Sequence, residues 1–187
     1  SKKDIPPTHR PCITGSNVTR YRVTWGGLAC LDSEEARCGG TWDPSRHEAR
    51  PKLVTRQIGR YPEFGLDPDG LHCLNTVFMV SMRDESMTAE TVLGILNSSL
   101  MRAYWIDHFY DQRRTFPKIK GTYLKQLPVL PSGRGKKSAG ILAELDQLSR
   151  ERTRLAEQAE EARGQGGDSV ISRRIESVER AIDRAVF

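Results

Sequence analysis

Two regularly spaced apolar stripes in residues 138–187 constrain the fold of this chain more than any other feature. Their apolar positions recur at steps of three and four residues, the spacing that one face of an α-helix produces. The stripes are Ile141, Leu145, Leu148, Leu155, Ala159 and Ala162, and then Ile171, Ile175, Val178, Ile182 and Ala185. The run GQGG at 164–167 permits a reversal between them. We therefore predict an antiparallel helical hairpin whose first arm has about 26 residues and is ~39 Å long.

The region before the hairpin begins with strand-like segments and then becomes helical. Alternating or β-branched runs predict strands within 21–25, 51–59 and 71–80, with a turn at 67–70 that contains Asp67 and Asp69. The apolar spacing over 88–110 predicts a helix, and its NSS step at 97–99 predicts a kink or a second helix capped by Asn97. A basic loop follows and leads into a short extended run that ends at Pro128 and Pro131.

These segments together predict an α+β fold. It has a small mixed sheet with packed helices, followed by the C-terminal antiparallel helical hairpin. We expect a first domain over residues 1–132, a Gly- and Lys-rich linker over 133–137, and the hairpin over 138–187.

The charge of the chain is unevenly distributed. Its net charge is +5, yet residues 111–137 carry eight Lys or Arg side chains against one acidic residue, and residues 61–110 carry two against seven. A concentrated positive segment is typical of a surface that binds nucleic acid, although a solvated basic loop has the same composition.

Cysteine usage and hydropathy limit the class of protein. Cys12, Cys30, Cys38 and Cys73 are widely spaced and form no CxxC pair, so we expect reduced thiols in a cytoplasmic protein rather than disulfides or zinc ligands. No run of eighteen apolar residues is present, so we expect no membrane span. His72, His108 and the three tryptophans are interpreted as packing residues, and we expect no metal site.

The candidate DNA-contacting residues form two groups. The first lies on or beside the strand at 51–59, where Arg and Gln side chains could pair with guanine and adenine edges in the major groove. The second lies in the basic loop, where Arg and Lys would contact phosphates. The residues are Lys52, Arg56, Gln57 and Arg60 in the first group, and Arg113, Arg114, Lys118 and Lys120 in the second.

The order of the motifs resembles a known family. The motifs are ITGSNVTRYRV (13–23), RPKLVTRQIG (50–59), LDPDGLHCLNTVFMV (66–80), LGILNSSLMRAYW (93–105) and FPKIKGTYLKQLPVLP (116–131), followed by ISRRIESVERAIDRAVF (171–187). Together they resemble the C-terminal specificity domain, or target-recognition domain, of adenine-N6 DNA methyltransferases from type II restriction–modification systems, with the bifunctional type IIG enzymes most similar. The resemblance implies a phage-defence protein that binds double-stranded DNA.

The resemblance also implies which parts are missing from this sequence. Such enzymes need an Asn/Asp-Pro-Pro-Tyr/Phe loop and a Gly-rich turn for S-adenosylmethionine, but the only Pro-Pro step here is Pro6-Pro7, between Ile5 and Thr8. No Glu-x-Lys follows Asp67 and Asp69, so a nuclease site is not expected. We therefore expect no catalytic residue and no cofactor in this chain. Catalysis, the cofactor and any endonuclease would belong to an upstream methyltransferase domain or to a separate methyltransferase subunit.

The prediction from sequence is thus a domain that reads a target site in the major groove while another domain methylates a flipped adenine. One alternative is a fragment of a type I-like specificity subunit, because those subunits also combine recognition domains with helical arms. A second alternative is a structural module that pairs with another subunit through its hairpin, with an incidental basic loop.

Overall fold

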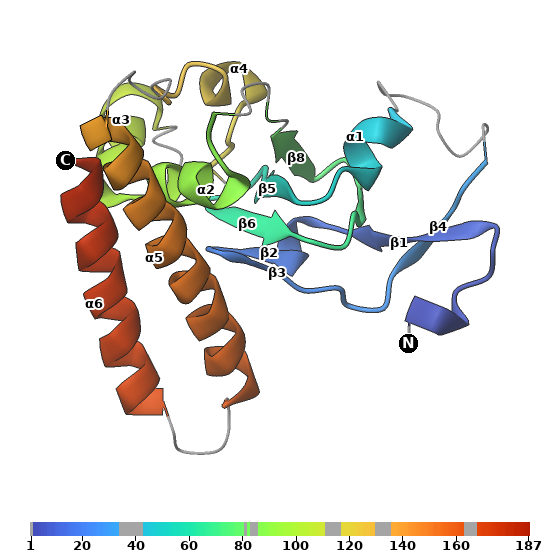
Figure 1. The fold of residues 1–187 in the computed structure, drawn as a ribbon. Helices are drawn as coiled ribbons and strands as arrows, with labels where there is room; N and C mark the ends of the chain where they lie inside the picture. The colour runs from blue at the N-terminus through green and yellow to red at the C-terminus, as the bar shows by residue number, and fades with distance from the viewer. Residues whose placement is uncertain are drawn as a thin grey trace.

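The computed structural model covers residues 1–187, and it describes residues 2–33, 43–80, 82, 86–110, 117–129, 136–162 and 168–187. Figure 1 shows short strands beside a group of helices, two of them long. The first part of the chain contains η1 (Lys2–Asp4), β1 (His9–Ile13), η2 (Gly15–Asn17), β2 (Val18–Thr19), β3 (Arg22–Val23), β4 (Ala29–Leu31), α1 (Pro44–Glu48), β5 (Lys52–Arg56), β6 (Phe64–Asp67), β7 (His72–Cys73) and β8 (Val77–Val80). The helices that follow are α2 (Ala89–Asn97), α3 (Ser99–Phe109), α4 (Gly121–Leu124), α5 (Lys136–Glu161) and α6 (Asp168–Val186).

The strands form three small sheets. β5 is the centre of an antiparallel sheet in the order β6-β5-β8. β1 pairs with β4 in the antiparallel sense and with β7 in the parallel sense, and β2 pairs with β3. The predicted α+β class with small mixed sheets is therefore confirmed.

The strand predicted at 21–25 is shorter in the structure because Tyr21 adopts a positive φ of 69° and forms part of the turn between β2 and β3. The side chain of Tyr21 is fully buried, and its backbone N–H donates to the Phe64 carbonyl on β6 at 2.7 Å. Gly65 permits this close approach, since a Cβ there would lie 2.6 Å from the Arg22 carbonyl oxygen.

The break between α2 and α3 confirms the prediction of two helices but corrects the capping residue. Ser98, rather than Asn97, caps α3, and its hydroxyl accepts a hydrogen bond from the Met101 N–H at 3.2 Å. The Asn97 amide binds β6 instead, where it accepts from the Phe64 N–H at 3.0 Å and donates to the Phe64 carbonyl at 2.9 Å. Asn97, which was predicted to cap α3, therefore forms hydrogen bonds with the buried backbone of β6 instead.

The two long helices lie side by side and extend away from the sheets (Figure 1). Arg152 on α5 and Glu179 on α6 join them through an ion pair with an N–O distance of 2.8 Å. The connection predicted at 164–167 lies outside the described residues. Both helices contribute to one core cluster with the sheet and α2; its buried members are Tyr21, Leu53, Phe64, Ala89, Val92, Leu93, Leu96, Met101, Leu145, Leu155, Val178 and Ile182. None of the helices in the described part of the chain has the length and apolar character of a membrane span.

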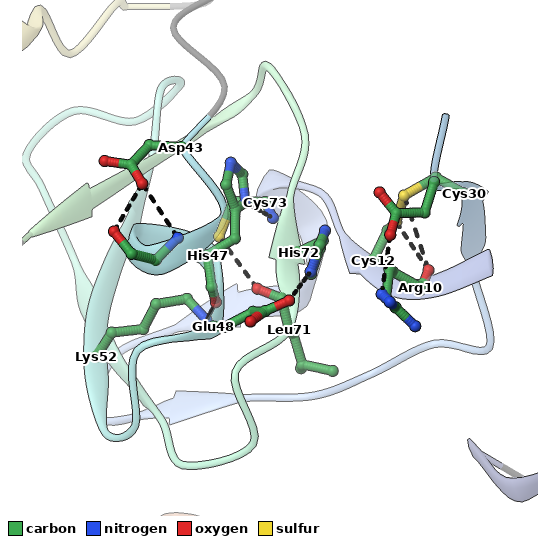
Figure 2. A network of polar contacts seen from close by, with 12 residues as sticks. Arg10, Cys12, Cys30, Asp43, His47, Glu48, Lys52, Leu71, His72 and Cys73 are labelled. Atoms are coloured by element: carbon green, nitrogen blue, oxygen red, sulfur yellow. Dashed lines mark hydrogen bonds and ion pairs between the residues drawn. A yellow bond between two sulfur atoms is a disulfide. The ribbon is translucent and has the colours of Figure 1, made fainter. Parts of the chain in front are cut away.

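The cysteines differ from the prediction. Cys12 on β1 and Cys30 on β4 form a disulfide, because the antiparallel pairing of these strands brings them together across 18 residues of sequence (Figure 2). The expectation of reduced thiols is therefore wrong for this pair. Cys73 is a free, buried thiol whose pKa burial raises to about 12. Cys38 lies outside the described residues.

Candidate nucleic-acid interface

Two segments that are sixty residues apart in the sequence meet in the structure. Ile58 forms an antiparallel β-bridge with Lys118. On one side of the bridge the Ile119 N–H donates to the Gln57 carbonyl at 2.8 Å, and on the other side the Gly59 N–H donates to the Pro117 carbonyl at 3.0 Å. The end of β5 and the described part of the basic loop therefore form one surface. Both segments contain residues that were predicted to contact DNA, but their pairing was not predicted.

Two further segments complete this surface. The Gln57 N–H donates to the Thr76 carbonyl at 3.0 Å, and the Thr76 hydroxyl accepts from the Gly15 N–H at 2.9 Å. Gly15 fits tightly here, because a Cβ at this position would lie 3.1 Å from the Thr76 carbonyl oxygen and 3.2 Å from the Arg56 Cβ. We call residues 15–17, 56–59, 75–76 and 117–120 the recognition edge.

Three of the predicted cationic residues are exposed at or beside the recognition edge. They are Arg60, Lys118 and Lys120, and none of them has an ion-pair partner among the described residues. The Arg60 guanidinium lies over the Tyr110 ring at 5.3 Å, and the Lys120 ammonium lies over the Tyr123 ring at 5.1 Å. Their positive charges are therefore available to an external anion.

An aromatic cluster packs next to Lys120. The Phe109 and Tyr123 rings are stacked with centroids 5.0 Å apart, and Trp105, which is 1% exposed, meets both edge-on. These contacts join α3 to α4, so the segment that carries Lys120 has a fixed backbone. An extended run was predicted here, and the helical turn of α4 corrects that prediction.

Arg56 and Gln57 occupy the centre of the recognition edge and are partly exposed. The Arg56 guanidinium binds Glu63 at 2.5 Å, while its Nε atom is buried without a hydrogen-bond partner among the described residues. The Gln57 amide likewise has no side-chain partner within the described ranges, although its backbone is bonded on both sides. Gln57 can therefore offer a donor and an acceptor from a fixed position.

Lys52 is the predicted contact residue that the structure contradicts. Its side chain is 2% exposed, and its ammonium donates to the buried Asp67 carboxylate at 2.5 Å. The same ammonium donates to the His47 carbonyl at 2.6 Å (Figure 2). Asp67 also accepts from the N–H groups of Asp69 and Leu71, which confirms its predicted role in the turn. Lys52 is thus part of the interior and is not available to DNA. Arg113 and Arg114 lie outside the described residues.

Two histidines lie next to this buried ion pair. The rings of His47 and His72 have centroids 5.2 Å apart, and the Nδ1 atom of His47 accepts from the Cys73 N–H at 3.0 Å (Figure 2). Burial, together with the positive charges of His72 and Lys52, lowers the pKa of His47 to about 4, and burial lowers the pKa of His72. Among the described residues, no group of three or more His, Cys, Asp or Glu side chains is arranged to hold a metal ion.

The recognition edge also contains exposed residues that the sequence analysis missed. Ser16, Ile58, Asn75 and Thr76 are all exposed. Asn75 and Thr76 were predicted to lie within a strand over 71–80, whereas they form the turn between β7 and β8. Nothing in their spacing indicated that this turn lies beside Gln57.

Uncompensated cations around hydrogen-bonding side chains, held on a fixed backbone, are typical of a domain that binds nucleic acid. One family model, described as the TaqI-like C-terminal specificity domain, matches residues 10–129 and includes all four segments of the recognition edge. Because the match covers more than half of the sequence, the chain belongs to this family, and the resemblance predicted from its motifs is confirmed. The family implies a DNA-recognition role in a methyltransferase of the restriction–modification type. No curated protein matches the chain.

Proposed function

We propose that this chain reads a short DNA sequence in the major groove through the recognition edge, on behalf of an adenine-N6 DNA methyltransferase. The observation that carries the proposal is the Ile58–Lys118 bridge, which brings the described part of the basic loop, residues 117–120, beside Arg56 and Gln57. The family match supports the proposal, because it includes both sides of the bridge.

The side chains of the recognition edge divide into two roles. Arg60, Lys118 and Lys120 would neutralise phosphates, since they are exposed and have no carboxylate partner among the described residues. Arg56 and Gln57 would contact base edges, because guanidinium and amide groups can form paired hydrogen bonds with guanine and adenine. The Arg56–Glu63 ion pair would orient the guanidinium before DNA binds. Arg113 and Arg114 remain proposed phosphate contacts from their sequence position alone.

The proposal divides the reaction between two parts of a larger enzyme. This chain supplies recognition and no catalytic group. A methyltransferase domain upstream, or a separate methyltransferase subunit, would bind S-adenosylmethionine and methylate a flipped adenine at N6. The partners are therefore double-stranded DNA and that catalytic part, in the cytoplasm.

The experiment measures DNA affinity of the full-length enzyme as a function of salt concentration. Replacing Lys118 and Lys120 with Ala should reduce the slope of log K against log salt by about 1.8, at 0.9 for each phosphate contact. Arg173→Ala is the matched control, because Arg173 is an exposed cation on α6 with no ion pair among the described residues. Its slope should equal that of the wild type.

Base reading is tested by the sequence preference of the same enzyme. Arg56→Ala or Gln57→Ala should each relax the preference at one or two positions by about 1–3 kcal/mol and change the salt slope less. If neither the slope nor the preference changes in any of these variants, the recognition edge is a solvated surface. The interaction module then becomes the better account of the chain.

A further inference from the structure

Ile58 is a large aliphatic residue at the centre of the recognition edge, and 47% of it is exposed. The other exposed side chains of this edge are polar or charged, namely Ser16, Asn75, Thr76, Lys118 and Lys120. An isolated exposed apolar residue needs no explanation by itself. Ile58, however, lies between the proposed base contacts and the proposed phosphate contacts, and this position suggests a role for its exposed side chain.

The β-bridge fixes where the Ile58 side chain lies. The hydrogen bonds fall between the residues before and after Ile58 and Lys118, so these two residues form the narrow, non-hydrogen-bonded pair of an antiparallel ladder. In such a pair the Cα atoms are about 4.5 Å apart and both side chains lie on the same face. Ile58 therefore lies beside the exposed ammonium side chain of Lys118, whereas the next residue on that strand, Ile119, is 3% exposed.

We propose that Ile58 packs against the C5-methyl group of a thymine in the recognised sequence. This inference rests on the proposed function. An A·T pair presents adenine N7 and N6 and the thymine methyl group in the major groove, which match an amide and an aliphatic side chain, respectively. Ile58 provides the aliphatic group on the same face as Lys118, and a phosphate contact by Lys118 sets its position on the duplex. Ile58 is thus a specificity-determining residue.

The test uses the full-length enzyme and its recognition sequence, obtained by sequencing DNA that the enzyme has methylated. Each thymine of that duplex is replaced in turn by deoxyuridine, which lacks only the methyl group. For the wild type, one replacement should lower the affinity about fourfold, the effect of one buried methyl group. Ile58→Ala should bind the thymine and deoxyuridine duplexes equally, and Ile58→Val should show an intermediate difference.

Leu31→Ala is the matched control, because Leu31 is 49% exposed on β4, outside the recognition edge. It should keep the full preference for thymine. The proposal is overturned if Ile58→Ala keeps that preference. It is also overturned if the wild type binds every deoxyuridine duplex as tightly as the thymine duplex, or if the recognised sequence contains no thymine. Such a result would leave the effects of Arg56, Gln57 and Lys118 substitutions in place, so it is distinct from a failure of the proposed function.

Discussion

Substituting Lys52 and Lys118 compares a buried lysine with an exposed one, in their effects on stability and on DNA binding. Both were candidate DNA contacts, yet Lys52 is 2% exposed beside a fully buried Asp67, and Lys118 is exposed. Lys52→Met would remove the ammonium and leave the Asp67 charge buried with two backbone N–H donors, from Asp69 and Leu71. It would also remove the donor that the His47 carbonyl now has at 2.6 Å.

The expected loss from Lys52→Met is about 3–5 kcal/mol, because breaking a buried ion pair leaves one charge uncompensated. For a chain of 187 residues this corresponds to a fall in melting temperature of roughly 10 °C. Lys118→Met should change the free energy of unfolding by less than about 0.5 kcal/mol, since an exposed side chain is replaced. The same substitution should reduce the salt slope of DNA binding by about 0.9.

Thermal and urea denaturation of the two variants, with DNA titrations at several salt concentrations, check both halves of this prediction. The reasoning is refuted if Lys52→Met melts within about 2 °C of the wild type while its salt slope falls by one unit. That outcome would mean that Lys52 reaches the phosphates and that the Asp67 pair does not stabilise the fold.

Three further predictions concern stability. Gly65→Ala should lower the free energy of unfolding by about 1–3 kcal/mol, because the new Cβ would clash with the backbone of β3. Gly140→Ala in α5, where a Cβ would have no neighbour within 4 Å, should raise it by up to about 1 kcal/mol. Urea denaturation of the two variants checks both values. The free energy of unfolding should fall as pH drops from about 6.5 to about 4, since the unfolded chain binds a proton that buried His47 excludes, and His47→Gln, which can still accept from Cys73 N–H, should reduce this slope. Ile175→Asp should cost several kcal/mol in a thermal melt, because Ile175 packs against the shared core; an unchanged melting temperature would contradict the apolar stripe.

Local patterns were sufficient to predict the longer helices and the strand β5, but not several short elements, such as β1, β4 and α4, or the contacts between elements. The three- and four-residue spacing predicted α5 and α6, and the β-branched run predicted β5. The cap of α3 was assigned one residue early, because Asn97 and Ser98 are both good capping residues. Only the position of Phe64, more than thirty residues away, determines that the Asn97 amide is used elsewhere.

The direction of Lys52 could not be predicted because β5 is covered on both faces. Its first four residues, 52–55, are all buried, so hydrophobic alternation does not identify an outward face. The antiparallel register places Lys52 opposite Asp67, and this non-local pairing explains why a lysine is buried. The Cys12–Cys30 disulfide depends on a non-local register in the same way.

The described fold unit is larger than the segment that the family model matches. The match ends at residue 129, but α5 and α6 supply Leu145, Leu155, Val178 and Ile182 to the same core as Phe64 and Leu93. Phe64 is bonded to Asn97 and to Tyr21, and the Arg152 guanidinium of α5 lies over the Tyr21 ring at 4.8 Å. β6 in turn pairs with β5, whose end carries Arg56 and Gln57. The recognition edge is therefore joined through packed side chains to the two long helices. If the edge binds DNA as proposed, a partner bound to these helices would also affect how the edge is oriented on DNA.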